Sequence, residues 1–122
     1  MRPLQTFATT AARTALLAGL GLGAVLSLTD WIDNRLADHD KMVHLAGFTA
    51  LSVVALLAFP RRPKTALACV MAFGVLLEIA QALGTRRSFE LLDLAANTFG
   101  ILAVGLLAWV ASALWARVRP AR

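Results

Sequence analysis

The sequence predicts an all-α integral membrane protein: one domain, residues 1–122, built as a bundle of four transmembrane helices with both termini in the cytoplasm. Apolar residues make up 59% of the 122 residues and charged residues only 16%, whereas about a quarter of an average soluble domain is charged. A soluble domain this small has too little interior to bury so much apolar surface. The apolar residues also fall into four runs of about 20, the length that crosses a bilayer.

The first predicted helix covers residues 12–29. Residues 14–29 carry no charge, and two alanines before Arg13 extend the apolar run toward the N-terminus. A secretory signal peptide is the alternative for such a segment, but no small-x-small cleavage site follows Leu28. We therefore expect an uncleaved helix.

The other three predicted helices cover residues 42–60, 65–84 and 91–116. The second ends where Pro60 and Pro63 enclose two arginines, because proline cannot continue the helical hydrogen bonding. The third carries one charge, Glu78, and the fourth has Asp93 and Asn97 near its start. Alternation with a period of two residues is absent from the sequence, which excludes a membrane β-barrel.

The basic residues predict the orientation. One side of the membrane would carry eight of them: Arg2, Arg13, Arg61, Arg62, Lys64, Arg117, Arg119 and Arg122. The other side would carry four: Arg35, Lys41, Arg86 and Arg87. The positive-inside rule then places both termini in the cytoplasm. Because the basic residues form short clusters between apolar runs and no continuous basic face, we expect no nucleic-acid partner.

Polar residues gather near the outer ends of three predicted helices. Pairs three or four residues apart share a helical face, and Glu78 and Asn97 both lie six residues inside a helix end, about 9 Å at 1.5 Å per residue. Three helices thus bring polar pairs to one layer. The candidate site residues are Asp40, Lys41, His44, Glu78, Gln81, Arg87, Asp93 and Asn97.

Glu78 is the most costly of these residues. A carboxylate in a spanning helix costs at least about 2.5–3.5 kcal/mol on insertion scales, so it requires a partner, a proton or a wet cavity. Arg87 is the preferred partner because its guanidinium can hold a carboxylate through two hydrogen bonds. Lys41 and His44 are the alternatives.

Three motifs carry a family resemblance. They are Asp40-Lys41-x-x-His44 with Phe48, Gly74-x-x-x-Glu78-x-x-Gln81, and Arg87-Ser88-Phe89-x-x-x-Asp93-x-x-x-Asn97-x-x-Gly100. In order and spacing, residues 40–105 resemble the VanZ-like membrane proteins. The resemblance implies a small multi-pass protein of the bacterial inner membrane and cell envelope. Name-giving members are associated with low-level resistance to the glycopeptide teicoplanin. Many relatives have a proline before the arginine, where this chain has Gly84-Thr85-Arg86-Arg87.

Three roles remain open for the polar residues. The first is a pocket for an anionic or polar ligand, a lipid or cell-wall precursor head group. Arg87 and Lys41 would supply positive charge, and Asn97 and Gln81 would supply hydrogen bonds. The second is a polar clasp that holds helices in register without binding anything, as in a structural partner subunit.

The third role is a membrane enzyme acting on a lipid-linked substrate. His44 would be a general base oriented by Asp40, with Glu78 as an acid. Asp40, His44, Glu78 and Asp93 are also the residues available to a metal, but a single intramembrane histidine and the lack of a cysteine cluster argue against zinc. We expect no metal and no cofactor, with membrane lipids or a lipid-linked envelope precursor as the partners, and the sequence favours binding over catalysis without deciding between them.

Overall fold

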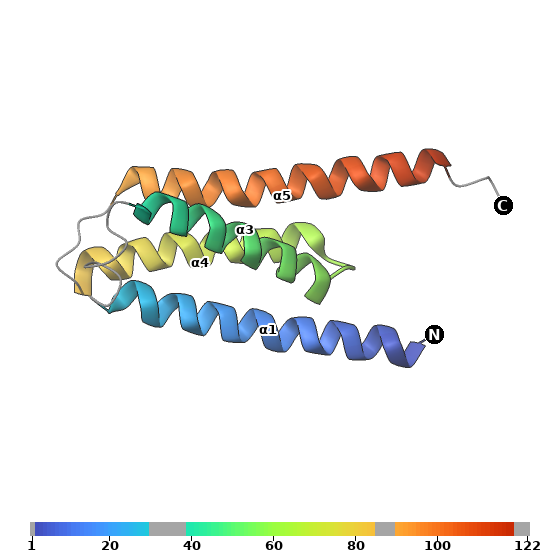
Figure 1. The fold of residues 1–122 in the computed structure, drawn as a ribbon, viewed down its shortest axis with the longest axis horizontal. Coiled ribbons are helices and arrows are strands. Elements are labelled where there is room, and N and C mark those ends of the chain that lie inside the picture. The colour runs from blue at the N-terminus through green and yellow to red at the C-terminus, as the bar shows by residue number, and fades with distance from the viewer. Residues whose placement is uncertain (1, 30–38, 85–89, 119–122) are drawn as a thin grey trace.

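The computed structural model describes residues 2–29, 39–84 and 90–118. These residues form four antiparallel α-helices: α1 (Arg2–Leu28), α3 (Asp40–Ala58), α4 (Pro63–Gly84) and α5 (Leu91–Val118). Each helix is long and apolar enough to cross a membrane. In Figure 1 the C-terminal ends of α1 and α4 lie at the same end of the bundle as the N-terminal ends of α3 and α5. The prediction of an all-α membrane protein with four spans is confirmed.

The observed bounds agree with the predicted ones within two residues, except at the start of α1. This helix begins at Arg2, ten residues before the predicted start. Pro3 is tolerated in the first turn, where its missing N–H is not required, and no glycine or further proline interrupts residues 4–13. The predicted start was set by the alanines before Arg13, whereas the helix continues through the Thr-containing residues that precede them.

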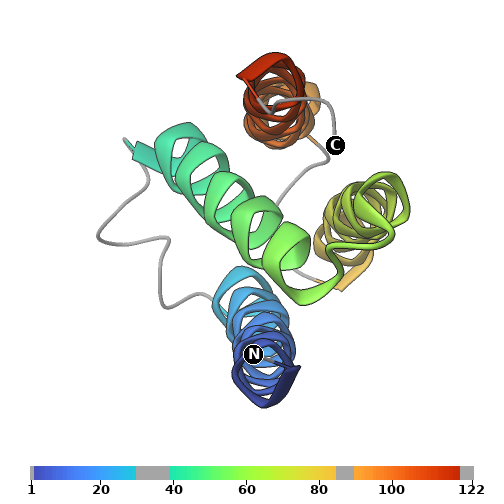
Figure 2. The same ribbon diagram turned by 90° about the vertical axis from the view of Figure 1, so that its right-hand side faces the viewer.

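α3 lies between the other helices. It packs most extensively against α5 and α1, and the end-on view in Figure 2 shows it crossing between them with α4 to one side. The buried apolar core is small and lies along α3 and the helix faces turned toward it. Its members include Leu16, Phe48, Ala55, Val70, Leu77 and Ile101. Most other large apolar side chains are exposed on the outside of the bundle, where a bilayer would cover them.

Two glycines let the helices approach α3 closely. A Cβ atom on Gly100 would lie 2.7 Å from Thr49 Oγ1 and 3.0 Å from the backbone oxygen of Leu45. A Cβ atom on Gly74 would lie 2.9 Å from the Phe48 ring. Small residues allow this kind of approach in membrane helix pairs. They hold α4 and α5 against the segment of α3 that carries the polar residues.

At the opposite end of the bundle, a basic residue of α1 contacts the C-terminal end of α3. Arg13 of α1 donates a hydrogen bond from Nε to the carbonyl oxygen of Ala58 at 3.2 Å. Its guanidinium also lies over the Phe59 ring, 5.1 Å from the centroid. A positive charge is favourable at the C-terminal end of a helix such as α3, where carbonyl groups lack helical partners. Arg13 thus stabilises the end of α3 opposite the one that carries Asp40.

Candidate functional site

Six of the eight predicted polar residues are at least nine-tenths buried at one end of the bundle. They are Asp40, His44, Glu78, Gln81, Asp93 and Asn97. They come from the start of α3, the end of α4 and the start of α5. Lys41 lies at the rim with about half of its side chain exposed. Arg87 lies outside the described residues, and so does its predicted contact with Glu78.

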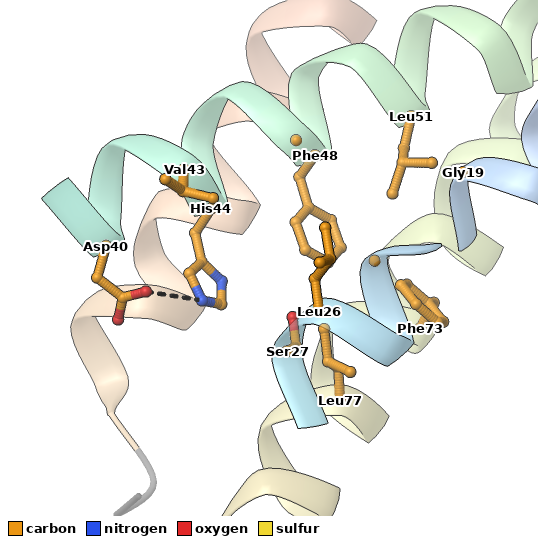
Figure 3. A pocket seen from close by; sticks show the side chains of 12 residues that line it. Gly19, Leu26, Ser27, Asp40, Val43, His44, Phe48, Leu51, Phe73 and Leu77 are labelled. Atoms are coloured by element: carbon orange, nitrogen blue, oxygen red, sulfur yellow. Dashed lines mark ion pairs between the residues drawn. The ribbon is translucent and has the colours of Figure 1, made fainter. Parts of the chain in front are cut away.

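His44 is at the centre of this group. Its Nδ1 lies 3.1 Å from Asn97 Oδ1 and 3.7 Å from Glu78 Oε1. Its Nε2 lies 3.7 Å from Asp40 Oδ1, the contact marked by the dashed line in Figure 3, and 4.0 Å from Asp93 Oδ2. One imidazole therefore contacts side chains from all three helices. These five residues, Asp40, His44, Glu78, Asp93 and Asn97, are called the His44 cluster below.

Two neighbours fix the orientation of the imidazole. An amide oxygen only accepts hydrogen bonds, so Nδ1 carries a proton and donates it to Asn97 Oδ1. The ring of Phe48 lies nearly parallel to the imidazole, at 4° with the centroids 6.5 Å apart. Phe48 is in turn held against Gly74. As a result, Nε2 is directed toward Asp40 and Asp93.

Lys41 connects α3 to the start of α5. Its Nζ lies 3.2 Å from Glu90 Oε2 and 3.6 Å from Asp93 Oδ1. Lys41 and His44 were the predicted alternative partners of Glu78, and His44 Nδ1 lies 3.7 Å from Glu78 Oε1. Glu90 was missed by the sequence analysis. The spacing could have indicated Glu90, since it precedes Asp93 by three residues at the start of a helix and so lies on the same face.

Gln81 makes a contact between helices that the sequence did not predict. Its Nε2 donates a hydrogen bond to the backbone oxygen of Ser27 at 2.9 Å. Ser27 lies in the last turn of α1, where carbonyl groups have no partner within the helix. Gln81 thus joins the end of α4 to the end of α1, beside the His44 cluster.

A cavity of about 170 Å³ adjoins the His44 cluster, between α1, α3 and α4. Asp40, His44 and Ser27 line it at one end, and Leu51 and Phe73 lie further along it (Figure 3). Its remaining lining is apolar or glycine: Gly19, Gly23, Leu26, Val43, Gly47, Phe48 and Leu77. The cavity exceeds the roughly 150 Å³ that accommodates benzene in a protein interior. It was not foreseen from the sequence.

The distance between His44 and Asp40 concerns the predicted role of His44 as a general base oriented by Asp40. His44 Nε2 and Asp40 Oδ1 are 3.7 Å apart, beyond the roughly 2.7–3.2 Å of a direct hydrogen bond. The two side chains face each other without forming a hydrogen-bonded dyad. The arrangement instead provides hydrogen-bonding and charged groups beside an apolar cavity, which suits the binding of an amphipathic molecule.

Comparison with known proteins agrees with the motifs. A family model described as VanZ/LLP1 matches residues 3–113. Neither a curated protein nor a solved structure matches the chain. The matched region contains every residue of the His44 cluster, and it extends the resemblance first seen in residues 40–105 to include α1. The chain therefore belongs to the VanZ-like family, as a membrane protein with four spanning helices.

Proposed function

We propose that this protein binds an amphipathic component of the cell envelope, a lipid or a lipid-linked cell-wall precursor, in the bacterial inner membrane. The anionic or polar head group lies at the His44 cluster, beneath the outer face of the membrane. An apolar chain of the same molecule lies in the adjoining cavity. Glycopeptide tolerance, the property associated with the name-giving relatives, would then depend on access to an envelope component.

The supporting observation is that one cavity has polar residues at one end and apolar residues along the rest of its lining. Along α3, the cavity lining passes from Asp40 and His44 to Gly47 and Leu51. Asp40 and Leu51 are eleven residues apart, about 16 Å of helix. A head group and the first part of an acyl or prenyl chain fit this length. A polar clasp with no ligand would instead be expected to close the space beside its buried groups, since protein interiors are close-packed.

The polar groups suit a head group with both acceptor and donor atoms. Asp40 accepts hydrogen bonds from hydroxyl or ammonium groups, and it lines the cavity. Lys41, half exposed at the rim beside Glu90 and Asp93, is the basic side chain that would contact a phosphate. Arg86 and Arg87 follow α4 in the sequence and lie outside the described residues.

Glycines at the cavity wall allow a direct test. Gly23 and Gly47 line the cavity, and a Cβ atom at either position would meet nothing within 4 Å. Gly23→Leu and Gly47→Leu should therefore fill the cavity without forcing the helices apart. Gly21→Leu is the matched control, because Gly21 lies on the same helix with equal space and does not line the cavity.

The measurement is native mass spectrometry of the purified protein, released from detergent after extensive washing. We expect the wild-type protein and Gly21→Leu to retain a lipid, and both cavity variants to retain at least about tenfold less, a loss of about 1.4 kcal/mol in binding. Adding back a polyprenyl phosphate or phosphatidylglycerol then identifies the head group. Equal retention by all four proteins, or no retention by the wild-type protein with either added lipid, would contradict the proposal.

A further inference from the structure

We propose that Asp40, His44 and Asp93 form a binding site for one divalent transition-metal cation. Each residue offers one ligand atom, and these atoms all lie within 4.8 Å of one another. Asp40 and His44 are one turn apart on α3, and Asp93 comes from the first turn of α5. The site shares Asp40 and His44 with the proposed position of the lipid head group, but the evidence for it and its test do not depend on lipid binding.

The distances within the site fit ligands of a shared ion. His44 Nε2 lies 3.7 Å from Asp40 Oδ1 and 4.0 Å from Asp93 Oδ2. Both distances exceed the roughly 2.7–3.2 Å of a direct hydrogen bond. Ligand atoms bound to one ion at about 2.0–2.2 Å lie about 3–4 Å from each other. The three side chains are thus separated by about the space that an ion occupies.

The environment of Asp93 is an independent indication. Asp93 is 3% exposed, yet its side chain accepts no hydrogen bond from any described residue. Oδ1 has Lys41 Nζ at 3.6 Å, and Oδ2 is directed toward His44. Burying a carboxylate without hydrogen bonds is costly, and buried charges are normally paired or coordinate metals. Oδ2, the oxygen on the His44 side, accepts no hydrogen bond from a described residue and is the atom that a cation between Asp93 and His44 would bind.

The ring nitrogen of His44 that would not bind the metal, Nδ1, already donates a hydrogen bond, as it does in most metal-binding histidines. Nδ1 donates its proton to Asn97 Oδ1 at 3.1 Å, which leaves the lone pair on Nε2, the atom facing both carboxylates. A metal-ligating histidine almost always donates its other N–H to such an outer partner. Glu78 lies on the Nδ1 side of the ring and is therefore not counted among the ligands.

The ligand set indicates the class of ion. One imidazole nitrogen with two carboxylate oxygens suits Zn²⁺ or Mn²⁺, whereas Mg²⁺ and Ca²⁺ favour sites made of oxygen alone. The sequence argued against zinc because only one intramembrane histidine is present. Two carboxylates meeting that histidine make up three protein ligands, the number found in zinc sites that keep a fourth position open.

Zinc binding by the purified protein tests this site. The full-length chain, with any polyhistidine tag removed, is titrated with Zn²⁺ in metal-free detergent buffer and followed by calorimetry. X-ray absorption of the zinc-loaded protein then counts the imidazole ligands. We expect one zinc per chain with one imidazole, and much weaker binding of Mg²⁺ and Ca²⁺. No stoichiometric zinc binding, or a zinc shell without imidazole, would overturn the proposal.

Variants distinguish a built site from general attraction to acidic residues. Replacing an outer partner of a metal ligand lowers metal affinity about 10–100-fold, and replacing a ligand itself should cost at least as much. Asp93→Asn and Asp40→Asn should therefore each lower zinc affinity by at least about tenfold. Glu90→Gln is the control: it removes the carboxylate 3.2 Å from Lys41 and leaves all three ligands. Thermal melting without zinc shows whether each variant is folded. Unchanged zinc affinity in a folded Asp93→Asn or Asp40→Asn protein would refute the site, as would an equal loss in Glu90→Gln.

Discussion

At the scale of single residues, spacing along the helix explains which polar side chains share a face. Asp40 and His44 are four residues apart, and so are Asp93 and Asn97, so each pair points in one direction. The sequence could therefore predict which polar side chains turn inward together. It could not predict contacts between helices. Lys41 on α3 reaches Glu90 and Asp93 only because of the way in which α3 packs against α5.

The hydrogen bond between His44 and Asn97 is the shortest contact in the His44 cluster. Asn97→Ala should lower the free energy of unfolding by about 1–3 kcal/mol, because it leaves a buried imidazole N–H without its acceptor. Unfolding in mixed detergent micelles, followed by circular dichroism, measures the change. Ser112→Ala is the control, since the exposed Ser112 hydroxyl bonds to the Trp109 carbonyl oxygen of its own helix, α5. An equal loss in both variants would mean that the contact adds no specific stability.

At the scale of helices, hydropathy and proline placement predicted where α3, α4 and α5 begin and end. The same reasoning failed at the start of α1, because residues 4–13 are helical although polar residues interrupt their apolar run. The cavity could not be predicted either. The open space beside Gly23 and Gly47 depends on how α1 crosses α3, and a hydropathy pattern carries no information about that crossing.

Gly100 sets the distance between α3 and α5. Gly100→Ala should cost about 1–3 kcal/mol of stability, because the added methyl group would overlap Thr49 Oγ1 and crowd the backbone oxygen of Leu45. In an open helical position the same change stabilises by up to about 1 kcal/mol, and Gly21→Ala serves as that control. The measurement is the detergent unfolding midpoint of each variant.

A double variant separates the two overlaps at Gly100. Adding Thr49→Ala removes the hydroxyl that lies 2.7 Å from the new methyl group and keeps the backbone atoms of Leu45 and Thr49 at 3.0 and 3.2 Å. We expect only partial recovery of stability. Full recovery would show that a flexible side chain, and not the approach of two backbones, limits this position.

At the scale of the whole molecule, the two ends of the bundle differ in chemistry. The His44 cluster lies at the end where α3 and α5 begin (Figure 1). Arg13 lies near the other end, together with the basic segment between α3 and α4. The positive-inside rule assigns this basic end to the cytoplasm. The His44 cluster would then meet the outer leaflet, where the proposed ligand must enter.

The side of the membrane that the His44 cluster faces is the claim on which the proposed function depends most. Cysteines at His39, exposed beside the cluster, and at Arg61, exposed at the other end, report it in a Cys69→Ala background that removes the native thiol. An impermeant maleimide is added to intact spheroplasts. We predict that His39→Cys is labelled at once and that Arg61→Cys is labelled only after the membrane is permeabilised. The reverse pattern would place the polar end in the cytoplasm and contradict the account.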